Sequence, residues 1–561
     1  MSTLDWVVLC CFTGFVVFYG IWKSKDTKDV DTYIRAGRTS GWWIVTLSIM
    51  ATQASAITFL STPGQAYVDG MRFVQFYFGL PIAMIILSIT AVPIYNKLNI
   101  YTAYEYLEKR LDLKNRMLGS ALFLTQRGLA AGFTIYAPAL ILSVVLGWEL
   151  DITIIIVGVM VILYTTVGGT VAVNKTHILQ MIIITAGMFS AFFILLSLLP
   201  EGVSIYDAAY IAGKLGKLNA VDFSFDLSNR YTFWSGIVGG TFLMLSYFGT
   251  DQSQVQRYLA GSSVKQSRLA LLVNGLVKVP MQFIILFIGA MVFVFFQFVT
   301  PPLFFNPIEE AKVKTGVYAE QYQDIEKEFI NIQNEKQRNL KELVNSINRN
   351  DDDAVNSHMN NILAQQQKAD QIKKSATEII KKSDPSAETN DTNYIFLTFI
   401  INFLPIGFIG LLIAAILSAS MSSTSAELNA LASTTVIDFY KRLIKKDADE
   451  KHYVRVSKIA TVFWGLYAVL FALLAKELGS LIEAVNILGS LVYGTILGIF
   501  LTAFYLKKVT GTPTFLGAVI AELIVLYCYF FTEIPFLWYN LIGCITVIVI
   551  ASMINKISKK S

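Results

Sequence analysis

Residues 42–69 read WWIVTLSIMATQASAITFLSTPGQAYVD, a stretch that is long and apolar enough to cross a bilayer yet carries a polar centre. Polar side chains at membrane depth are tolerated mainly where a helix faces a cavity or a partner helix. Pro63 cannot donate a hydrogen bond to the carbonyl of Phe59, so the sequence predicts that the helix bends or ends near there. Four polar residues stand where a simple membrane anchor would carry leucine: Thr52, Gln53, Ser55 and Thr58.

This combination fits two kinds of helix. One is the interrupted, site-forming helix of a secondary transporter, in which freed backbone groups and polar side chains meet near the middle of the membrane. The other is a polar seam between two packed spans. The stretch by itself favours neither interpretation.

The whole chain has the composition of a polytopic membrane protein. Of its 561 residues, 54% are hydrophobic and only 15% are charged, and the mean hydropathy is +0.55. Soluble domains carry roughly 25% charged residues. This composition excludes a soluble enzyme and a nucleic-acid-binding protein. It predicts that most of the chain lies in the lipid bilayer. The apolar run at residues 4–22 lacks a basic start and a cleavage site, so we expect it to remain as a span.

A hydropathy window of about 19 residues predicts thirteen spans. Basic residues gather in alternate short loops, whereas loops such as 148–151 and 532–535 carry none. By the positive-inside rule the N-terminus is outside and the C-terminus is inside, as an odd number of spans also requires. The predicted spans are 4–22, 42–69, 72–97, 117–147, 151–170, 176–199, 232–256, 267–299, 394–436, 457–475, 481–505, 513–531 and 536–555.

Residues 301–393 have a polar, highly charged composition that does not suit the membrane. Leu340, Leu343 and Ile347 recur at helical spacing, which predicts a helical hairpin or a short coiled coil with a break at residues 349–353. The predicted topology places this segment outside the cell.

The chain is thus expected to divide into a transmembrane part at 1–300, an extracytoplasmic helical insertion at 301–393 and a second transmembrane part at 394–561. The insertion could dock a protein partner or act as a lid. Its composition favours the plainer interpretation, a solvated insertion without a role in transport.

A second polar concentration lies in LLIAAILSASMSSTSAELNALAS, residues 411–433. Hydroxyl oxygens, together with carbonyls freed at a helix break, are suitable ligands for a weakly charged hard cation such as Na⁺. The alternative is that small hydroxylated residues only permit close helix packing. An interrupted polar helix elsewhere in the chain favours the ion site.

Four motifs together resemble the sodium:solute symporter family, which includes sodium/glucose, sodium/monocarboxylate and sodium/iodide cotransporters. The resemblance implies a LeuT-like core of ten helices in two inverted five-helix repeats, formed here by the second to sixth and the seventh to eleventh spans. It covers most of the chain outside the insertion. The motifs are YTTVGGTVAV at 164–173, IYAPAL at 135–140, ASMSSTSAELNALAS at 419–433 and above all YFGTDQSQVQRYLA at 247–260.

The resemblance also implies where sodium, the coupling ion, would bind. The family's common sodium site uses backbone carbonyls of the first core helix, and a carbonyl plus two hydroxyls of the eighth. The matching positions in this chain are Ala51, Ala54, Ala419, Ser422 and Ser423.

Two departures from the family pattern predict a single sodium ion per transport cycle. His177 stands where some members place an aspartate for a second sodium, and Ser425 is followed by Ala426 where a second hydroxyl would be needed. Glu427 is a carboxylate within a predicted span, which is costly unless it is paired. We therefore expect His177 or Lys175 to pair with Glu427 and to replace the second ion.

Six residues are candidates for the solute site. Asp251 stands where the family usually has asparagine; an ionised aspartate facing the cavity would favour a polyol or an amine and repel an anion unless a cation offsets it. Arg127 could be that cation, could bind a substrate carboxylate, or could form a purely structural ion pair. The resemblance adds four more positions: Gln53, Thr58, Tyr77 and Asn486.

The sequence therefore predicts a sodium-coupled symporter, and not an enzyme, that imports a small polar solute across the cell membrane by alternating access. Sugars or polyols, monocarboxylates and sialic-acid-like compounds all remain open as solutes. A sensor that keeps the transporter fold and signals through the insertion is the main alternative. A channel is disfavoured because no repeated filter-like segment is present.

Overall fold

The computed structural model describes residues 2–23, 38–226, 228–474 and 480–558, except the side chains of 17, 21 and 167–175. The part it describes is helical throughout and contains no β-strand; one isolated bridge pairs Ser40 with Gly261. The helices before the insertion are α1 (Thr3–Lys23), α3 (Trp42–Gln53), α4 (Ala56–Asp69), η2 (Gly70–Tyr77), α5 (Leu80–Ile89), α6 (Ala91–Leu98), α7 (Tyr104–Arg110), α8 (Leu113–Leu146), α9 (Leu150–Ser197), α10 (Ile205–Lys214), η3 (Ser235–Gly239), α11 (Gly240–Gly249), α12 (Gln252–Leu259) and α13 (Val264–Phe298).

Among the described residues, ten helices are long and apolar enough to cross a membrane, fewer than the thirteen expected spans. One reason is that Ala56–Leu98 is a single apolar stretch that covers parts of the two expected spans 42–69 and 72–97. Another is that Leu150–Thr166 and Ser235–Gly249, within the expected spans 151–170 and 232–256, are apolar but short. The remaining helices are α14 (Pro307–Thr315), α15 (Ala319–Asn348), α16 (Asp352–Ser383), α17 (Thr392–Phe403), α18 (Phe408–Thr434), η4 (Thr435–Ile444), α19 (Glu450–Leu474), α20 (Leu481–Tyr505), α21 (Gly511–Phe531) and α22 (Phe536–Ser558).

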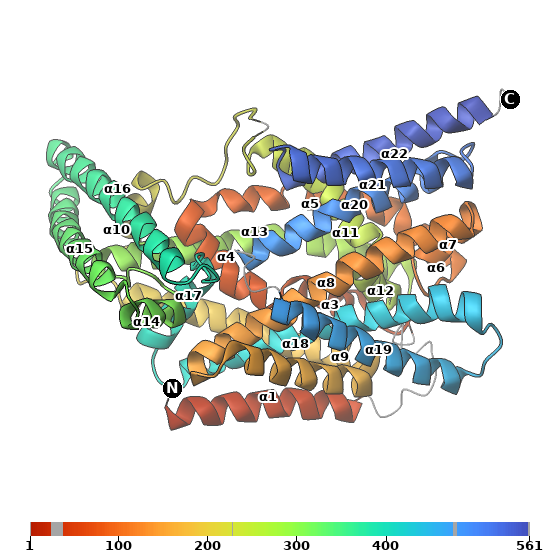
Figure 1. Cartoon of the computed structure of the whole chain (residues 1–561), viewed down its shortest axis with the longest axis horizontal. Helices are drawn as coiled ribbons and strands as arrows, with labels where there is room; N and C mark the ends of the chain where they lie inside the picture. The colour runs from red at the N-terminus through yellow and green to blue at the C-terminus, as the bar shows by residue number, and fades with distance from the viewer. Residues whose placement is uncertain (1, 24–37, 227, 475–479, 559–561) are drawn as a thin grey trace.

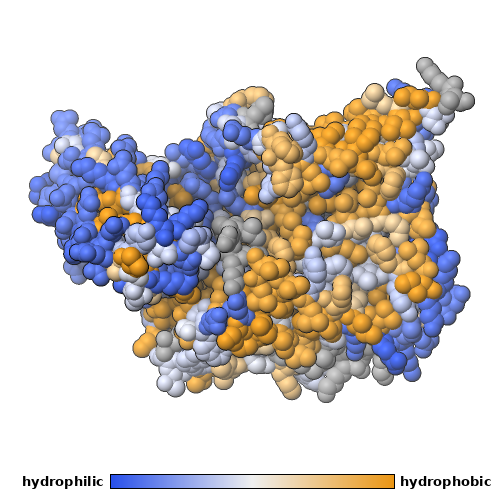
Figure 2. Space-filling view, viewed as in Figure 1, coloured by the Kyte–Doolittle hydropathy of each residue, from blue (hydrophilic) through white to orange (hydrophobic). Residues whose placement is uncertain are grey.

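The membrane body lies between two polar ends. In Figure 1 the long helices run along the long axis of the molecule; α1 begins at the end that carries α15 and α16, and α22 finishes at the opposite end. Figure 2 shows a largely apolar body between the hydrophilic insertion on the left and a polar rim on the right. An apolar girdle bounded in this way is what a multi-pass membrane protein presents to lipid.

The polar stretch at residues 42–69 is interrupted, but earlier than Pro63 predicted. The chain leaves helical geometry at Ala54, where ψ is 75°, and at Ser55, where ψ is 176°. The amide of Ala54 closes α3 on the carbonyl of Met50 at 2.7 Å, and Thr58 N donates to Ser55 O at 3.0 Å. The carbonyls of the last turn of α3 are thereby left without helical donors.

Pro63 lies inside α4 and does not end it; of the two expected outcomes, a bend or an end near Phe59, the end is therefore wrong. Neighbouring backbone packs closely around the proline. A Cβ on Gly289 of α13 would meet the Pro63 carbonyl oxygen at 2.2 Å, and a Cβ on Gly64 would meet the Thr392 carbonyl oxygen at 2.0 Å. Helix α4 is therefore held on two sides by neighbours that approach its backbone directly.

A second interruption separates α11 from α12, and the sequence reasoning did not predict it. Thr250 N closes α11 on Ser246 O at 2.8 Å. Asp251 then caps α12, with its Oδ1 accepting from the amide of Ser253 at 2.8 Å. Helix α12 packs against α3, so the two broken helices lie side by side within the membrane body.

The insertion forms the predicted helical hairpin. Helices α15 and α16 pack together, and the chain turns between them at residues 349–351. Leu340 and Leu343 are fully buried in this contact, and Ile347 is partly buried. The hydrophobic spacing that predicted the hairpin thus describes its packed face.

The hairpin rests on the C-terminal end of α4. The Lys373 ammonium of α16 lies 5.8 Å from the ring centre of Tyr67 in α4 and 5.2 Å from that of Phe305. Burial lowers the pKa of Lys373. Beside this contact, Asp391 accepts a hydrogen bond from the amide of Phe305 at 2.8 Å. These contacts join the insertion to the broken helix.

We expect Gly289→Ala to destabilise the protein because the added methyl group has no room between α13 and α4. Overpacking of this kind costs about 1–3 kcal/mol. The measurement is the thermal unfolding temperature of the detergent-purified protein. Gly14→Ala in α1 is the matched control, because nothing lies within 4 Å of a Cβ there. Equal unfolding temperatures for the two variants would contradict the packing described for α4.

A pH dependence is expected from the segment that joins the hairpin to α17. Burial raises the pKa of Glu388 from 4.5 to about 7, and the nearby Glu309 adds to this effect. The folded protein therefore binds more protons than the unfolded chain between these pH values, so stability falls as the pH rises through 7. Glu388→Gln should flatten this dependence, as measured by unfolding temperatures at pH 5 and pH 8. An unchanged slope would contradict it.

Candidate functional site

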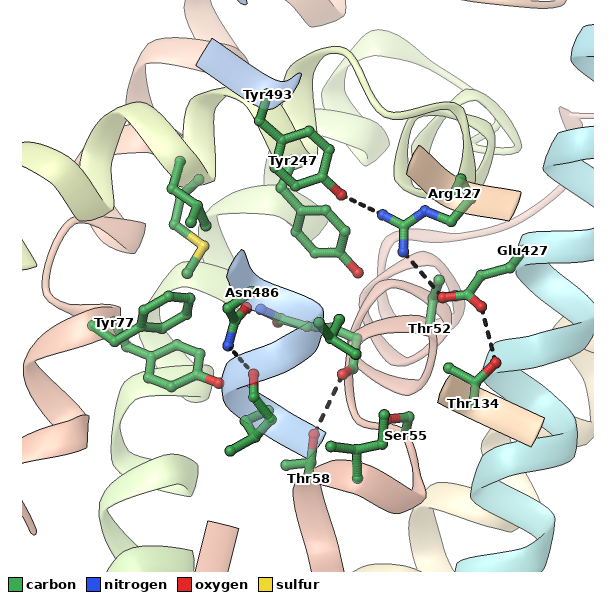
Figure 3. A pocket seen from close by; sticks show the side chains of 17 residues that line it. Thr52, Ser55, Thr58, Tyr77, Arg127, Thr134, Tyr247, Glu427, Asn486 and Tyr493 are labelled. Atoms are coloured by element: carbon green, nitrogen blue, oxygen red, sulfur yellow. Dashed lines mark hydrogen bonds and ion pairs between the residues drawn. The ribbon is translucent and has the colours of Figure 1, made fainter. Parts of the chain in front are cut away.

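A cavity opens where the two broken helices face α8, α18 and α20, as Figure 3 shows. Its volume is about 80 Å³, which is room for several water molecules or a small solute. The lining combines a polar wall with aromatic and aliphatic side chains, the usual character of a small-molecule site. The lining residues are Thr52, Gln53, Ser55, Ile57, Thr58, Phe76, Tyr77, Arg127, Thr134, Leu243, Met244, Tyr247, Glu427, Ile482, Val485, Asn486 and Tyr493.

Arg127 of α8 is the central charge of this cavity. Its side chain is only 4% exposed, and its guanidinium contacts two carboxylates. Nη1 donates to Oε1 of Glu427 at 3.0 Å, Nε donates to Oδ2 of Asp251 at 3.1 Å, and Nη2 also donates to Asp251. The guanidinium further lies 5.4 Å from the ring centre of Tyr247. A guanidinium fork suits this planar recognition of carboxylates.

Both carboxylates have further partners that hold them in place. The hydroxyl of Tyr493 in α20 donates to Oδ2 of Asp251 at 2.8 Å and accepts from Nη2 of Arg127. Oε2 of Glu427 accepts from the hydroxyl of Thr134 at 3.1 Å. The network therefore joins α8, the start of α12, α18 and α20. Buried charges are tolerated only when they are paired and hydrogen-bonded in this way.

The five expected sodium ligands lie on two helices that pack against one another, α3 with its break and α18. All five are buried. Ala51 stands in the last turn of α3 and Ala54 at the break, where backbone carbonyls lack helical donors. On α18, the Ser422 hydroxyl has no hydrogen-bond partner among the described residues, while that of Ser423 donates to the carbonyl of Ala419 at 3.2 Å. A buried hydroxyl oxygen without a partner fits a cation ligand.

The expected pairing of His177 with Glu427 is wrong. His177 Nδ1 lies 3.1 Å from the Ser48 hydroxyl of α3, whereas Glu427 pairs with Arg127. Histidine is a weaker partner for a buried carboxylate than a guanidinium, which is always charged and offers several donors. The side chain of Lys175, the other expected partner, lies outside the described residues.

The structure brings five of the six candidate solute residues to the cavity: Gln53, Thr58, Tyr77, Arg127 and Asn486. Asp251 is different, because it lies behind Arg127 and does not line the cavity, contrary to the expectation that it faces the solute. Its place as the cap of α12 and its bonds to Arg127 account for this position.

Three residues of the network were missed by the sequence reasoning: Thr134, Tyr247 and Tyr493. A signal existed for two of them. Tyr247 begins the motif that contains Asp251, and Thr134 directly precedes the IYAPAL motif. Nothing in the sequence around Tyr493 connects it to Arg127, because that contact depends on how α20 packs against α8.

Comparison with protein families gives a match to the sodium:solute symporter family over residues 33–318 and 382–521. The two matched segments make up most of the chain. The part between them falls on α15 and α16 of the insertion.

Individual relatives agree with this match. The human sodium/iodide cotransporter is 32% identical over 48% of the chain and 41% of its own length, and human sodium-coupled monocarboxylate transporter 1 is 36% identical over 48% and 43%. The chain thus spans less than half the length of these two proteins. The sodium/sialic acid symporter SiaT of Proteus mirabilis strain HI4320 is 24% identical over 97% of the chain and 93% of its length.

The fold also matches a solved structure. The substrate-bound, outward-open state of a Na⁺-coupled sialic acid symporter superposes with a TM-score of 0.76 at 21% identity. The match covers 99% of this chain and 98% of that one. At this level of identity the match establishes the fold.

We expect Arg127→Met to destabilise the protein strongly, because it leaves Asp251 and Glu427 buried without a cation. Breaking a buried pair in this way costs about 3–5 kcal/mol. The triple variant R127M/D251N/E427Q should recover much of the loss, since it removes the uncompensated charges. Unfolding temperatures of the purified variants provide the measurement.

Arg230→Met is the matched control for this experiment. Arg230 also pairs with a carboxylate, Glu483 at 3.1 Å, but its side chain is 57% exposed. An exposed pair contributes about 0–1 kcal/mol. If R127M were no more destabilising than R230M, the buried ion pairs of Arg127 would not stabilise the fold as predicted.

Proposed function

The chain belongs to the sodium:solute symporter family, and we propose on that premise that it is a sodium-coupled symporter that imports a small polar organic solute by alternating access. The observation that carries the proposal is the meeting of a broken, polar α3–α4 helix with the serine-rich α18 beside a buried polar cavity. Such a break, lined by freed carbonyls, is where secondary transporters bind ion and solute. Sodium is the coupling ion and enters as a co-substrate.

We place one sodium ion between the carbonyls of Ala51, Ala54 and Ala419 and the hydroxyls of Ser422 and Ser423. The free hydroxyl of Ser422 and the missing helical bonds at Ala54 support this site. All five ligands are neutral oxygens, which hold a monovalent cation without binding it too tightly for release.

We propose a single sodium ion per cycle. At the position where some members of the family have an aspartate, this chain has His177, whose Nδ1 lies 3.1 Å from the Ser48 hydroxyl. Ser425, which bonds to Thr165 at 2.7 Å, is followed by Ala426, which has no hydroxyl. Glu427 is held by Arg127. In this proposal, Arg127 takes over the stabilising role that we assigned to His177 or Lys175.

We further propose the family architecture for the whole chain: thirteen spans, two inverted five-helix repeats in a LeuT-like core, and the N-terminus outside with the C-terminus inside. The insertion at residues 301–393 would then lie outside the cell, between transmembrane parts at 1–300 and 394–561. The placement of the start of α1 and of the hairpin at one end of the molecule, with the end of α22 at the other, supports this topology.

Coupling in this proposal depends on the broken helix. Sodium bound at the break holds α3, α4 and α18 together, which stabilises the form of the cavity that accepts the solute. A ligand shifts a conformational equilibrium only through different affinity for the two states. The solute then binds against Gln53, Thr58, Tyr77 and Asn486, and both are released when the repeats rearrange.

We expect Ser422→Ala and Ser423→Ala to raise the sodium concentration for half-maximal uptake by about tenfold, the effect of losing about 1.4 kcal/mol of ion binding. The measurement is solute uptake into proteoliposomes at increasing NaCl, with choline chloride keeping the ionic strength constant. Ser433→Ala is the control, because Ser433 lies three turns further along α18 and bonds to Asn429 O at 2.6 Å. An unchanged sodium requirement in both variants would contradict the site.

The same vesicles distinguish the alternatives. A symporter accumulates solute against its gradient when sodium is supplied outside, a channel conducts without accumulation, and a sensor binds without transport. Uptake that does not change when choline replaces sodium would reject the proposed coupling.

A further inference from the structure

The guanidinium of Arg127 has almost no hydrogen-bonding capacity left for a solute. An arginine side chain has five N–H donors. Four are directed at protein groups: Nε and one Nη2 donor toward Asp251, the other Nη2 donor toward Tyr493, and one Nη1 donor toward Glu427. One Nη1 donor remains.

One remaining donor is a poor anchor for a carboxylate. Strong recognition of a carboxylate by arginine uses two parallel N–H donors. An anionic solute in this cavity would also face Glu427, with the Asp251 carboxylate directly behind Arg127, in surroundings where charge repulsion is weakly screened. The protein's own carboxylates thus already engage the donors with which Arg127 would bind a substrate carboxylate.

The opposite wall offers partners for hydroxyl groups. Oε1 of Gln53 is buried and accepts no hydrogen bond from the described residues. Thr58 and Tyr77 contribute hydroxyls to the same cavity, and the amide of Asn486 lies there as well, with its Nδ2 bonded to Ile482 O at 2.7 Å. A solute hydroxyl that donates to Gln53 would satisfy an acceptor that is otherwise left without a partner.

We propose that the cavity selects an uncharged, hydroxyl-bearing solute and rejects carboxylates, and that Asp251 determines this selectivity by occupying the guanidinium of Arg127. The inference rests on the proposed symport. Asp251, Glu427 and Arg127 together carry one net negative charge. The single sodium ion neutralises it, so the loaded cavity holds no net charge that would attract an anion. Two of the relatives are named for anions, iodide and monocarboxylates, whereas the solute proposed for this chain is uncharged.

Asp251→Asn is the decisive substitution. Asparagine caps a helix as well as aspartate does, so α12 is expected to keep its start. The change removes the negative charge that holds Nε and Nη2 of Arg127 toward Asp251. A neutral amide oxygen holds the guanidinium less strongly than a carboxylate does, so the guanidinium can turn its donors toward a substrate carboxylate. We expect it to raise affinity for carboxylates by about tenfold or more, the range for hydrogen bonds to charged groups.

Two sets of probes of matched size test this expectation in the full-length protein. The first is lactate, propane-1,2-diol and 1-amino-2-propanol; the second is gluconate, sorbitol and glucamine. Each set holds an anion, a neutral hydroxyl compound and a cation on one carbon skeleton. The readout is the thermal stabilisation that each probe gives in NaCl beyond that in choline chloride, since a ligand that binds the folded state stabilises it by mass action.

The native protein should prefer the neutral member of a set over its carboxylate by at least tenfold, and D251N should reverse that order. Tyr493→Phe separates charge from donor count, because it frees one N–H of Arg127 while both carboxylates stay. It should keep the neutral preference. A native protein that binds the carboxylate or the amine as well as the neutral compound overturns the proposal, and so does a D251N variant that gains no carboxylate binding.

A failure of the proposed symport function would give a different result in the same thermal measurement. Sodium alone, compared with choline and without any solute, should stabilise both the native protein and D251N if the ion site exists. If sodium stabilises neither protein, the symport proposal fails. If sodium stabilises both while the order of the probes is the same in each, only the selectivity assigned to Asp251 fails.

Discussion

A positive charge buried in the middle of a membrane body has to be neutralised, and that requirement ties four helices together. Arg127 of α8 contacts Asp251 at the start of α12 and Glu427 of α18, and Tyr493 of α20 bonds to both Arg127 and Asp251. All four groups are buried, so each one's position depends on the others. The same contacts give the break between α11 and α12 a structural role, because the break brings the Asp251 carboxylate to the guanidinium of Arg127.

Helical periodicity and composition predicted much of the fold. The apolar runs, the interrupted polar stretch and the hairpin of the insertion are local patterns, and each is present as a helix or a pair of helices. The position of the break was harder to predict. Pro63 is a strong local signal, but it lies inside α4, where Gly289 and Thr392 approach the helix backbone closely. The break at Ala54 depends on its neighbours, and only the family resemblance pointed to it.

The candidate site shows the same division: local sequence patterns predicted some of its features, and tertiary packing determines the others. Side chains in the polar centre of the first broken helix, such as Gln53 and Thr58, were readable from the sequence because they interrupt an apolar run. The sequence did not show which cation pairs with which buried carboxylate. Glu427 was correctly recognised as a carboxylate that needs a cation, yet Arg127 and His177 lie 300 and 250 positions away in sequence and only packing decides between them. Asp251 was expected to face the solute, but it does not line the cavity and instead bonds to the Arg127 guanidinium.

The hairpin of α15 and α16 has a practical consequence for imaging. Membrane proteins that lie almost wholly within a detergent micelle offer few landmarks for aligning single particles in electron cryomicroscopy. Here a pair of helices of 30 and 32 residues projects beyond the apolar body at one end, as Figures 1 and 2 show. Because Lys373 seats this pair on the rings of Tyr67 and Phe305, the projection is joined directly to α4. It would serve as a built-in alignment marker, and its tilt would report the orientation of α4, the second half of the broken helix.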